Sequence, residues 1–250
     1  MRNSVPFLKR RGAPVTGQVR RYSEGRMSMR IVLSKDNVSA AIRAMDLYSR
    51  IFMGQYDHLN WDIRLNADSK KITWKEIEGA EIMRTFMFKE IRDILIPDLA
   101  HFELYASHGI WNFDKNDPRA IDAYDMQQTI RFTDAWFRRP EGGIGVYFSK
   151  PWIRGRYPEV KVEITGTRSD YQMTIELLPE QFVILKEAAE VFLHAQCQEY
   201  EKMFEMFTDD KNALGLAREA EQYNVVQKPD SEAPAAALIK CLENQEGGKK

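Results

Sequence analysis

The chain has 250 residues, 44% of them hydrophobic and 29% charged, and its formal net charge is −1 at pH 7. These values are ordinary for a soluble globular protein with one large domain or two small ones. No apolar run approaches the roughly 18 residues of a membrane span, and the charged-then-apolar order of a signal peptide is missing. Cys197 and Cys241 are the only cysteines, which excludes a disulfide framework or a four-thiolate zinc site and leads us to expect a reducing, cytoplasmic setting.

The net charge hides an asymmetry. Residues 1–30 carry eight Lys and Arg but one acid, Glu24, a net charge of +7, so residues 31–250 carry −8. We therefore predict a basic flexible arm over 1–28. Three interpretations stay open: a solvated tail (or a stretch upstream of a start at Met27 or Met29), an arm that docks on a partner or nucleic acid by releasing counterions, and an Arg-rich transit peptide.

The first regular elements are predicted to be a short strand over 30–33 and one long helix over 34–59. Ser34 is a good N-cap, because its hydroxyl can accept a hydrogen bond from a free amide of the first turn. Apolar residues recur with helical spacing and predict a helix buried over more than half of its circumference. Gly54 is expected to end or bend this helix. The apolar stripe includes Val38, Ile42, Met45 and Phe52.

The remaining elements follow from caps, prolines and alternation. Pro97 stops one predicted helix, Asp117-Pro118 begins another with an acidic N-cap, and Pro179 opens the last long one. Alternating apolar residues on both sides of a Gly166–Asp170 turn predict a hairpin. The predicted helices are 74–96, 118–138 and 179–207, the strands are 159–165 and 171–178, and a mobile C-terminal tail over 226–250 holds a short helix at 234–243.

The two strand–helix units echo each other. A shift of 144 residues aligns Met29, Ile31 and Leu33 with Met173, Ile175 and Leu177, without a gap. Five identities over about thirty positions do not distinguish a true repeat from the shared pattern of amphipathic helices. In either case we expect two similar long helices, each entered from a strand, to lie side by side over one small sheet.

Two segments carry a resemblance. The stretch AMDLYSRIFMGQYDHL resembles an "ALDLYSRI-x-x-GQ" segment of uncharacterised bacterial and prophage-encoded proteins, and AIDAYDMQQTIRF (120–132) resembles an "AYD-x-x-Q-x-I-R" segment of the same group. Together they cover less than a fifth of the chain. The resemblance implies a phage or bacterial origin, and it implies neither a mechanism nor a functional residue.

Candidate chemistry is sparse, and we predict neither a metal nor a cofactor. His194 and Cys197 could form half of a metal site, and His101, Glu103 and His108 could converge, but spacing alone does not fix a ligand set. The glycines at 142, 143 and 145 follow a helix, whereas a phosphate cradle precedes one. Buried pairing of Asp46 with Arg50 or of Asp125 with Arg131 would orient helices as readily as it would bind a ligand.

The loop at 138–158 mixes positive charge with aromatic rings. This mixture suits a protein interface, single-stranded nucleic acid or an ordinary packed connection. We predict a partner-binding surface here, made of Arg138, Arg139, Tyr147, Lys150, Trp152, Arg154, Arg156 and Tyr157.

The sequence as a whole predicts an α+β fold, mainly helical, with three or four long helices packed on a small antiparallel sheet in a single domain over 29–225. We expect a non-enzymatic protein of phage or prophage type that binds a host or viral protein and inhibits or modulates it. One alternative is an enzyme or small-ligand sensor that uses His101, His108, Asp125 or Arg131; another is a nucleic-acid-binding protein. A homo-oligomer is also open, and no membrane association is expected.

Overall fold

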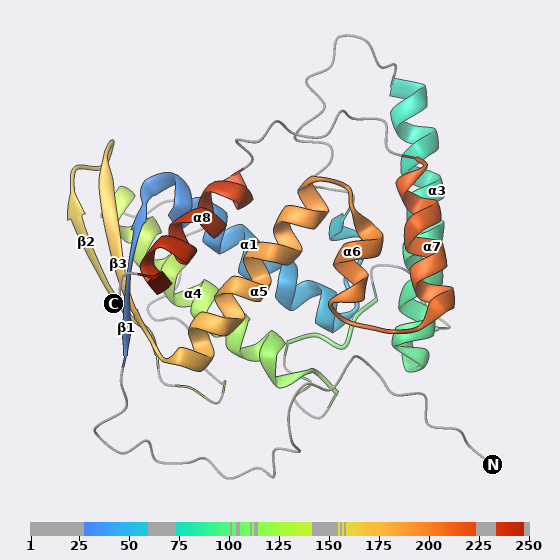
Figure 1. Ribbon diagram of the computed structural model, residues 1–250, viewed down its shortest axis with the longest axis horizontal. Coiled ribbons are helices and arrows are strands. Elements are labelled where there is room, and N and C mark those ends of the chain that lie inside the picture. Colours follow the sequence, from blue (N-terminus) through green and yellow to red (C-terminus); the bar gives the residue numbers. More distant parts are fainter. Residues whose placement is uncertain are drawn as a thin grey trace. The chain divides into compact units, whose positions relative to one another are not determined.

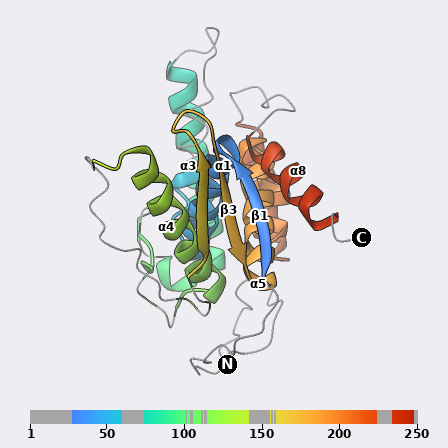
Figure 2. The same cartoon turned by 90° about the vertical axis from the view of Figure 1, so that its left-hand side faces the viewer.

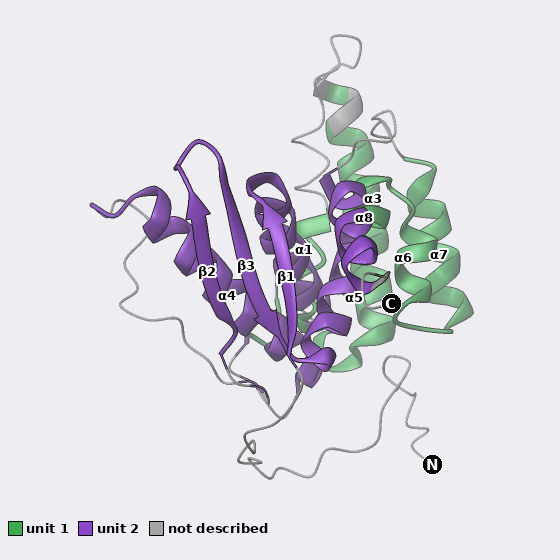
Figure 3. Ribbon diagram, turned by 60° about the vertical axis from the view of Figure 1, so that its left-hand side comes forward, with its two compact units in different colours: residues 1–18, 53–109, 193–230 green, residues 19–52, 110–192, 231–250 purple. Residues whose placement is uncertain are grey.

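A computed structural model describes residues 28–59, 74–100, 102–103, 106–110, 112, 115–141, 155, 157, 159–223 and 234–247. The fold is mainly helical α+β with a small antiparallel sheet, as the sequence predicts (Figure 1). The chain divides into two compact units, which we call the sheet unit (19–52, 110–192 and 231–250) and the helical unit (1–18, 53–109 and 193–230; Figure 3). The single domain expected over 29–225 stays a prediction, and the predicted basic arm lies outside the described residues.

The sheet has three strands in the order β1-β3-β2, and both neighbouring pairs are antiparallel. The strands are β1 (Met29–Ser34), β2 (Lys161–Gly166) and β3 (Tyr171–Leu177). The hairpin is confirmed: Gly166 has a φ of +111°, and Thr167 and Asp170 exchange main-chain hydrogen bonds across the turn. Glycine adopts this φ without strain, so the turn fixes the β2–β3 register.

Each strand alternates between a core face and an outer face. On the core face, Ile31 lies opposite Ile175 and Leu33 opposite Met173, and each of these four side chains is at most 1% exposed. The outer face is polar, with ion pairs between Arg30 and Glu163 and between Lys161 and Glu176. One sheet face therefore holds the core, and helices α4 and α5 lie behind it (Figure 2).

The two strand–helix units match in detail. Helix α1 (Lys35–Met53) follows β1, and α5 (Pro179–Gln196) follows β3. The first residues of the two helices are 144 positions apart, and so are the paired residues Ile31 of β1 and Ile175 of β3. The Tyr48 hydroxyl on α1 donates to Glu187 Oε2 on α5 at 2.6 Å, which shows that the two helices are in contact. Nine buried positions correspond under this shift: 38, 40, 41, 44, 45, 47, 48, 51 and 52 of α1 with 182, 184, 185, 188, 189, 191, 192, 195 and 196 of α5.

Helix α8 (Pro234–Gly247) covers the free edge of β1. Leu238 and Leu242 are buried, so these residues belong to the folded sheet unit, although the sequence predicts a mobile tail there with a helix over 234–243. The Gln245 side chain accepts from the Val32 amide at 2.7 Å and donates to the Val32 carbonyl at 2.9 Å. One side-chain amide thus satisfies both main-chain groups that a neighbouring strand would pair with.

The helical unit contains α3 (Trp74–Leu95), the 3-10 turn η1 (Pro97–Leu99), α6 (Tyr200–Glu205) and α7 (Lys211–Glu221). The rings of Phe88 and Tyr200 pack edge to face with centroids 5.0 Å apart. The buried Arg92 donates to the main-chain oxygens of Leu99, Phe102 and Glu103 and to the Asp93 carboxylate. A charged side chain therefore organises the turn that follows α3.

Two predicted helices end before their predicted last residue. The first ends at Met53 rather than Leu59, and the expectation that Gly54 ends it is confirmed: Gly54 has a φ of +85°, and a Cβ there would lie 2.7 Å from Leu99 Cδ1. The last long helix is not continuous over 179–207, because Gln198 has a φ of +55° and separates α5 from α6. Gln198 is the one described non-glycine residue with a positive φ, and no sequence signal marks it.

Candidate functional site

The structure describes three of the eight residues predicted to bind a partner: Arg138, Arg139 and Tyr157. Tyr147, Lys150, Trp152, Arg154 and Arg156 lie outside the described residues. Arg138 and Arg139 stand at the C-terminal end of helix α4 (Pro118–Arg138), whereas Tyr157 lies further along the chain beside the middle of α4, where it lines a hollow. All three described residues therefore lie on or beside α4.

Arg138 contacts a buried polar network at the end of α4. It pairs with Asp134, one turn earlier, while the other Asp134 oxygen accepts from the Tyr171 hydroxyl of β3. Asp134 is 1% exposed and Tyr171 is 2% exposed. Burial, followed by the hydrogen bond to Asp134, raises the pKa of Tyr171 above its ordinary value. Asp134 therefore fastens the end of α4 to the sheet, whereas Arg138, with 46% of its side chain exposed, and Arg139 both lie at the surface.

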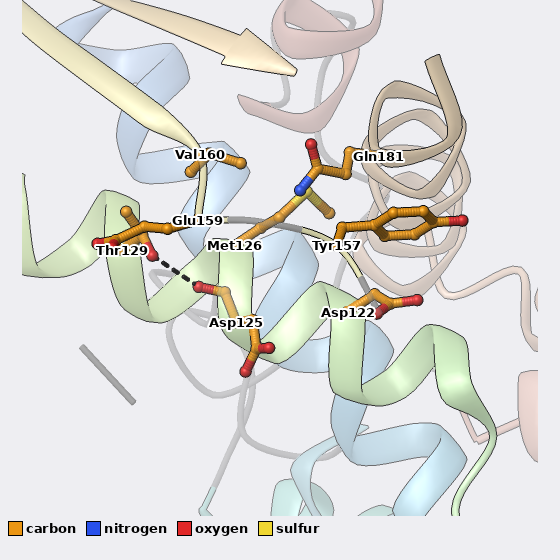
Figure 4. A pocket seen from close by; sticks show the side chains of 8 residues that line it. All are labelled: Asp122, Asp125, Met126, Thr129, Tyr157, Glu159, Val160 and Gln181. Atoms are coloured by element: carbon orange, nitrogen blue, oxygen red, sulfur yellow. Dashed lines mark hydrogen bonds between the residues drawn. The ribbon is translucent and has the colours of Figure 1, made fainter. Parts of the chain in front are cut away.

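A shallow acidic hollow lies against the middle of α4 (Figure 4). Asp122 and Asp125 lie three residues apart on one face of the helix and are 2% and 8% exposed. The Thr129 hydroxyl donates to the Asp125 main-chain oxygen at 3.0 Å, so the floor of the hollow is also braced within the helix. The lining residues are Asp122, Asp125, Met126, Thr129, Tyr157, Glu159, Val160 and Gln181.

Gly155 lies directly against these carboxylates. Its amide donates to Asp125 Oδ2, and a Cβ at this position would lie 2.5 Å from Asp122 Oδ1 and 2.8 Å from Asp125 Oδ2. Such distances are below any normal carbon–oxygen contact, so only glycine fits here without movement. The main chain at residue 155 is thus positioned by the acidic face of α4.

The size of the hollow limits what it can hold. The space that the centre of a water molecule can reach inside it is about 10 Å³, which is room for roughly one water molecule. Its polar lining is mainly made of carboxylate and amide groups, which accept hydrogen bonds from cationic or N–H donors. The arrangement therefore suits one donor group, such as the Gly155 amide, better than a whole substrate.

A second polar network joins α4 to both repeated helices. Arg119 donates to Asp117 through two nitrogens, at 3.1 and 2.9 Å, and its guanidinium lies 4.8 Å from the centre of the Phe52 ring. A third guanidinium nitrogen lies 3.7 Å from Glu187 Oε2, the atom that accepts a hydrogen bond from the Tyr48 hydroxyl. Burial, with the nearby Glu187 charge, raises the pKa of Tyr48 above its ordinary value and keeps the phenol protonated. This network is a structural clamp of the sheet unit.

The two charge pairs weighed from the sequence differ in outcome. Asp46 and Arg50 do form an ion pair, at 2.8 Å, and both are partly exposed. Asp125 is buried in the hollow, whereas Arg131 is exposed on the same helix. On the same helix, burial raises the pKa of Tyr124 above its ordinary value, and the charges of Arg131, Asp125, Asp46 and Arg50 act on it more weakly.

The histidines of the helical unit have separate partners. His108 lies 3.2 Å from Asp98, and His194 lies 3.0 Å from Glu199. His101 lies outside the described residues, as do the glycines at 142, 143 and 145. No group of three or more His, Cys, Asp or Glu side chains in the described part of the chain has the arrangement of a metal site. The His194–Cys197 spacing therefore joins no such group among these residues.

The most exposed apolar surface of the helical unit is a row along α3. Ile82 and Phe86 are 61% and 58% exposed, one helical turn apart, and Met83 beside them is 38% exposed. Glu78 and Glu90 continue the same i, i+4 row at its two ends. We call the four residues Glu78, Ile82, Phe86 and Glu90 the α3 row. No sequence signal distinguishes Phe86 from the buried Phe88 two residues later, and only the packing shows that Phe86 is exposed.

No helix within the described residues combines the length and apolar character needed to cross a membrane. No protein-family model, curated protein or solved structure matches the chain.

Proposed function

We propose that this chain is a protein–protein interaction protein that modulates a host protein, and that its partner binds the α3 row. The observation that carries the proposal is the exposure of Ile82 and Phe86, which present two large apolar side chains on one helix face. Isolated exposed apolar residues are common, but adjacent ones on a helix are typical of binding surfaces. The phage or prophage origin rests on the two short sequence resemblances.

The charges of the row define the chemistry of the partner. Two carboxylates, Glu78 and Glu90, flank the apolar pair at a spacing of one turn on each side. An amphipathic helix with two apolar anchors and a Lys or Arg at each end matches this pattern. The apolar anchors supply the affinity, and the flanking charges set the orientation and the association rate.

The acidic hollow favours this function over the enzyme or ligand-sensor alternative. It has room for only about one water-sized group, and the Gly155 amide already donates to Asp125 there. Of the residues named for that alternative, His108 pairs with Asp98 and Arg131 is exposed. The interaction function needs only the exposed α3 row.

The test is a binding comparison with the full-length chain as bait in a bacterial extract. Ile82→Ser with Phe86→Ser should remove a partner that the wild-type chain retains, with a loss of about tenfold or more in affinity. The reason is that more than half of each residue is exposed and would be covered by the partner. Val183→Ser is the matched control, since Val183 is 52% exposed on α5. Unchanged retention by the double Ser variant would refute the α3 row as the interface.

A second variant tests the loop. Replacing Trp152, Arg154 and Arg156 by Ala removes the aromatic and basic groups of the predicted surface at 138–158. If this variant loses the partner while the double Ser variant keeps it, the interface lies on the loop and the proposal for α3 fails. Circular dichroism and thermal unfolding of every variant serve as the control that the fold is intact.

A further inference from the structure

The two edges of the sheet are treated differently. At the β1 edge, α8 covers the strand, and Gln245 pairs with both main-chain groups of Val32. At the β2 edge, no strand or pairing side chain lies beside the strand within the described residues. An open strand edge presents unpaired amides and carbonyls and can pair with another chain.

Two rows of apolar residues run across the core face of the sheet, and both are less well buried at β2 than at β1 and β3. One row runs from Ile31 through Ile175 to Val162, and the next from Leu33 through Met173 to Ile164. The β1 and β3 members are at most 1% exposed, whereas Val162 and Ile164 are only partly buried. A further strand next to β2 would complete the burial of both rows.

We infer that β2 pairs with β2 of a second copy of this chain, in antiparallel orientation about a two-fold axis at Val162. The strand carries Lys161 and Glu163 on its outer face. With Val162 opposite Val162 of the second copy, each Lys161 faces the other copy's Glu163, and both ion pairs form at once. The alternative register with Glu163 at the axis places like charges opposite each other, which disfavours it. The product is a continuous six-stranded sheet across two copies.

This inference is independent of the proposed function, because the surfaces lie in different units. The α3 row belongs to the helical unit and β2 to the sheet unit. Loss of the dimer therefore does not predict loss of the partner protein, and each test can fail by itself.

Charge exchange tests the register in the full chain, by light scattering or sedimentation over a concentration series. Wild type is expected to be a dimer. Lys161→Glu or Glu163→Lys alone should weaken the dimer by about tenfold or more, because each change creates two like-charge contacts. The Lys161→Glu/Glu163→Lys double variant should restore it. Glu176→Gln is the control, since it removes the partner of Lys161 within the sheet and leaves the predicted interface intact.

A cross-linking experiment gives a second readout in a Cys197→Ser/Cys241→Ser background. Val162→Cys should join two copies with a short thiol cross-linker, because the side chains of opposed residues are only about 5 Å apart. Thr165→Cys should not be cross-linked, because in this register Thr165 of one copy lies six residues, or about 20 Å, along the strand from Thr165 of the other copy. A monomeric wild type, a dimer unaffected by the single charge reversals, a double variant that stays monomeric, or no cross-link at Val162 would each overturn the inference.

Discussion

Ile31 of β1 and Ile175 of β3 lie directly opposite each other, and they are also the residues that correspond when the two strand–helix units are aligned. Both are at most 1% exposed. The equivalent residues of the two strand–helix units therefore lie side by side between β1 and β3. A local two-fold axis that relates the two strand–helix units would pass between them. The echo in the sequence thus has a counterpart in three dimensions.

This pair predicts a coupled core. Ile31→Ala and Ile175→Ala should each lower the free energy of unfolding by about 2–5 kcal/mol, since each leaves a cavity between tightly packed strands. The double variant should cost less or more than the sum by at least about 0.5 kcal/mol, because the residues touch. Urea unfolding measures all three. Thr174→Ala, on the outer face, is the control and should cost no more than about 1 kcal/mol; strict additivity at Ile31 and Ile175 would contradict their contact.

Arg92 is predicted to be the main polar support of the helical unit. Arg92→Ala removes the guanidinium that donates to the main-chain oxygens of Leu99, Phe102 and Glu103. Because that guanidinium is fully buried, the loss of these hydrogen bonds should cost about 3 kcal/mol or more. Arg92→Lys should recover only part of this, because one ammonium cannot reproduce the planar fork. Arg43→Ala, an exposed position on α1, should change the free energy of unfolding by less than about 0.5 kcal/mol. Equal stability of Arg92→Ala and Arg43→Ala would refute the role of Arg92.

Gly155 gives a prediction with a built-in rescue. Gly155→Ala should destabilise the protein by about 1–3 kcal/mol, because the new Cβ overlaps the carboxylate oxygens of Asp122 and Asp125. Asp122→Ala should relieve the steric part of this penalty when combined with it. Gly215→Ala in helix α7 is the matched control and should stabilise by up to about 1 kcal/mol, since no atom lies within 4 Å of its added Cβ. Thermal unfolding measures the expected loss of stability at Gly155 and the expected gain at Gly215. A Gly155→Ala variant as stable as wild type would mean that the main chain does not pack against Asp122.

Tyr171 predicts a specific dependence on alkaline pH. Its pKa is raised above 10.0 by burial and by Asp134, so the folded protein holds the phenolic proton more tightly than the unfolded chain does. The resulting stabilisation is fully present below the unfolded pKa of about 10 and is lost as the pH rises through the raised folded pKa. Above pH 10.0, the free energy of unfolding of Tyr171→Phe should therefore fall with pH less steeply than that of wild type, by up to about 1.4 kcal/mol per pH unit. Parallel curves from neutral to alkaline pH would contradict the linkage.

Local signals allowed most of the fold to be predicted. Asp117 caps α4 by accepting from the Arg119 amide, and Ser34 accepts from the Asn37 amide at 3.4 Å, as their positions before a helix predict. The α+β class, the hairpin and the helices over 74–96 and 118–138 follow from the same kind of evidence. Such signals are legible in sequence because each depends on residues only a few positions apart.

The remainder depends on contacts between distant residues. The interruption at Gln198 carries neither glycine nor proline, and α7 has no counterpart in the predictions, since its buried face is made of small residues such as Ala213 and Ala217. The acidic hollow was also missed: Asp125 was considered as a partner of Arg131 and as a candidate ligand-site residue, while its contact with Gly155 spans thirty residues. For the predicted partner surface, the structure describes Arg138, Arg139 and Tyr157 and leaves its function a proposal.

The cover that α8 places on β1 has a consequence for synthesis. Strand β1 leaves the ribosome early, its partner β3 follows about 140 residues later, and Gln245 emerges last of the three. At about 5–20 residues per second, β1 waits roughly ten seconds or more before it can pair, and longer before its outer edge is closed. During that interval the nascent chain carries an unpaired strand, so the cell's holdase chaperones have a defined segment, 29–34, to protect.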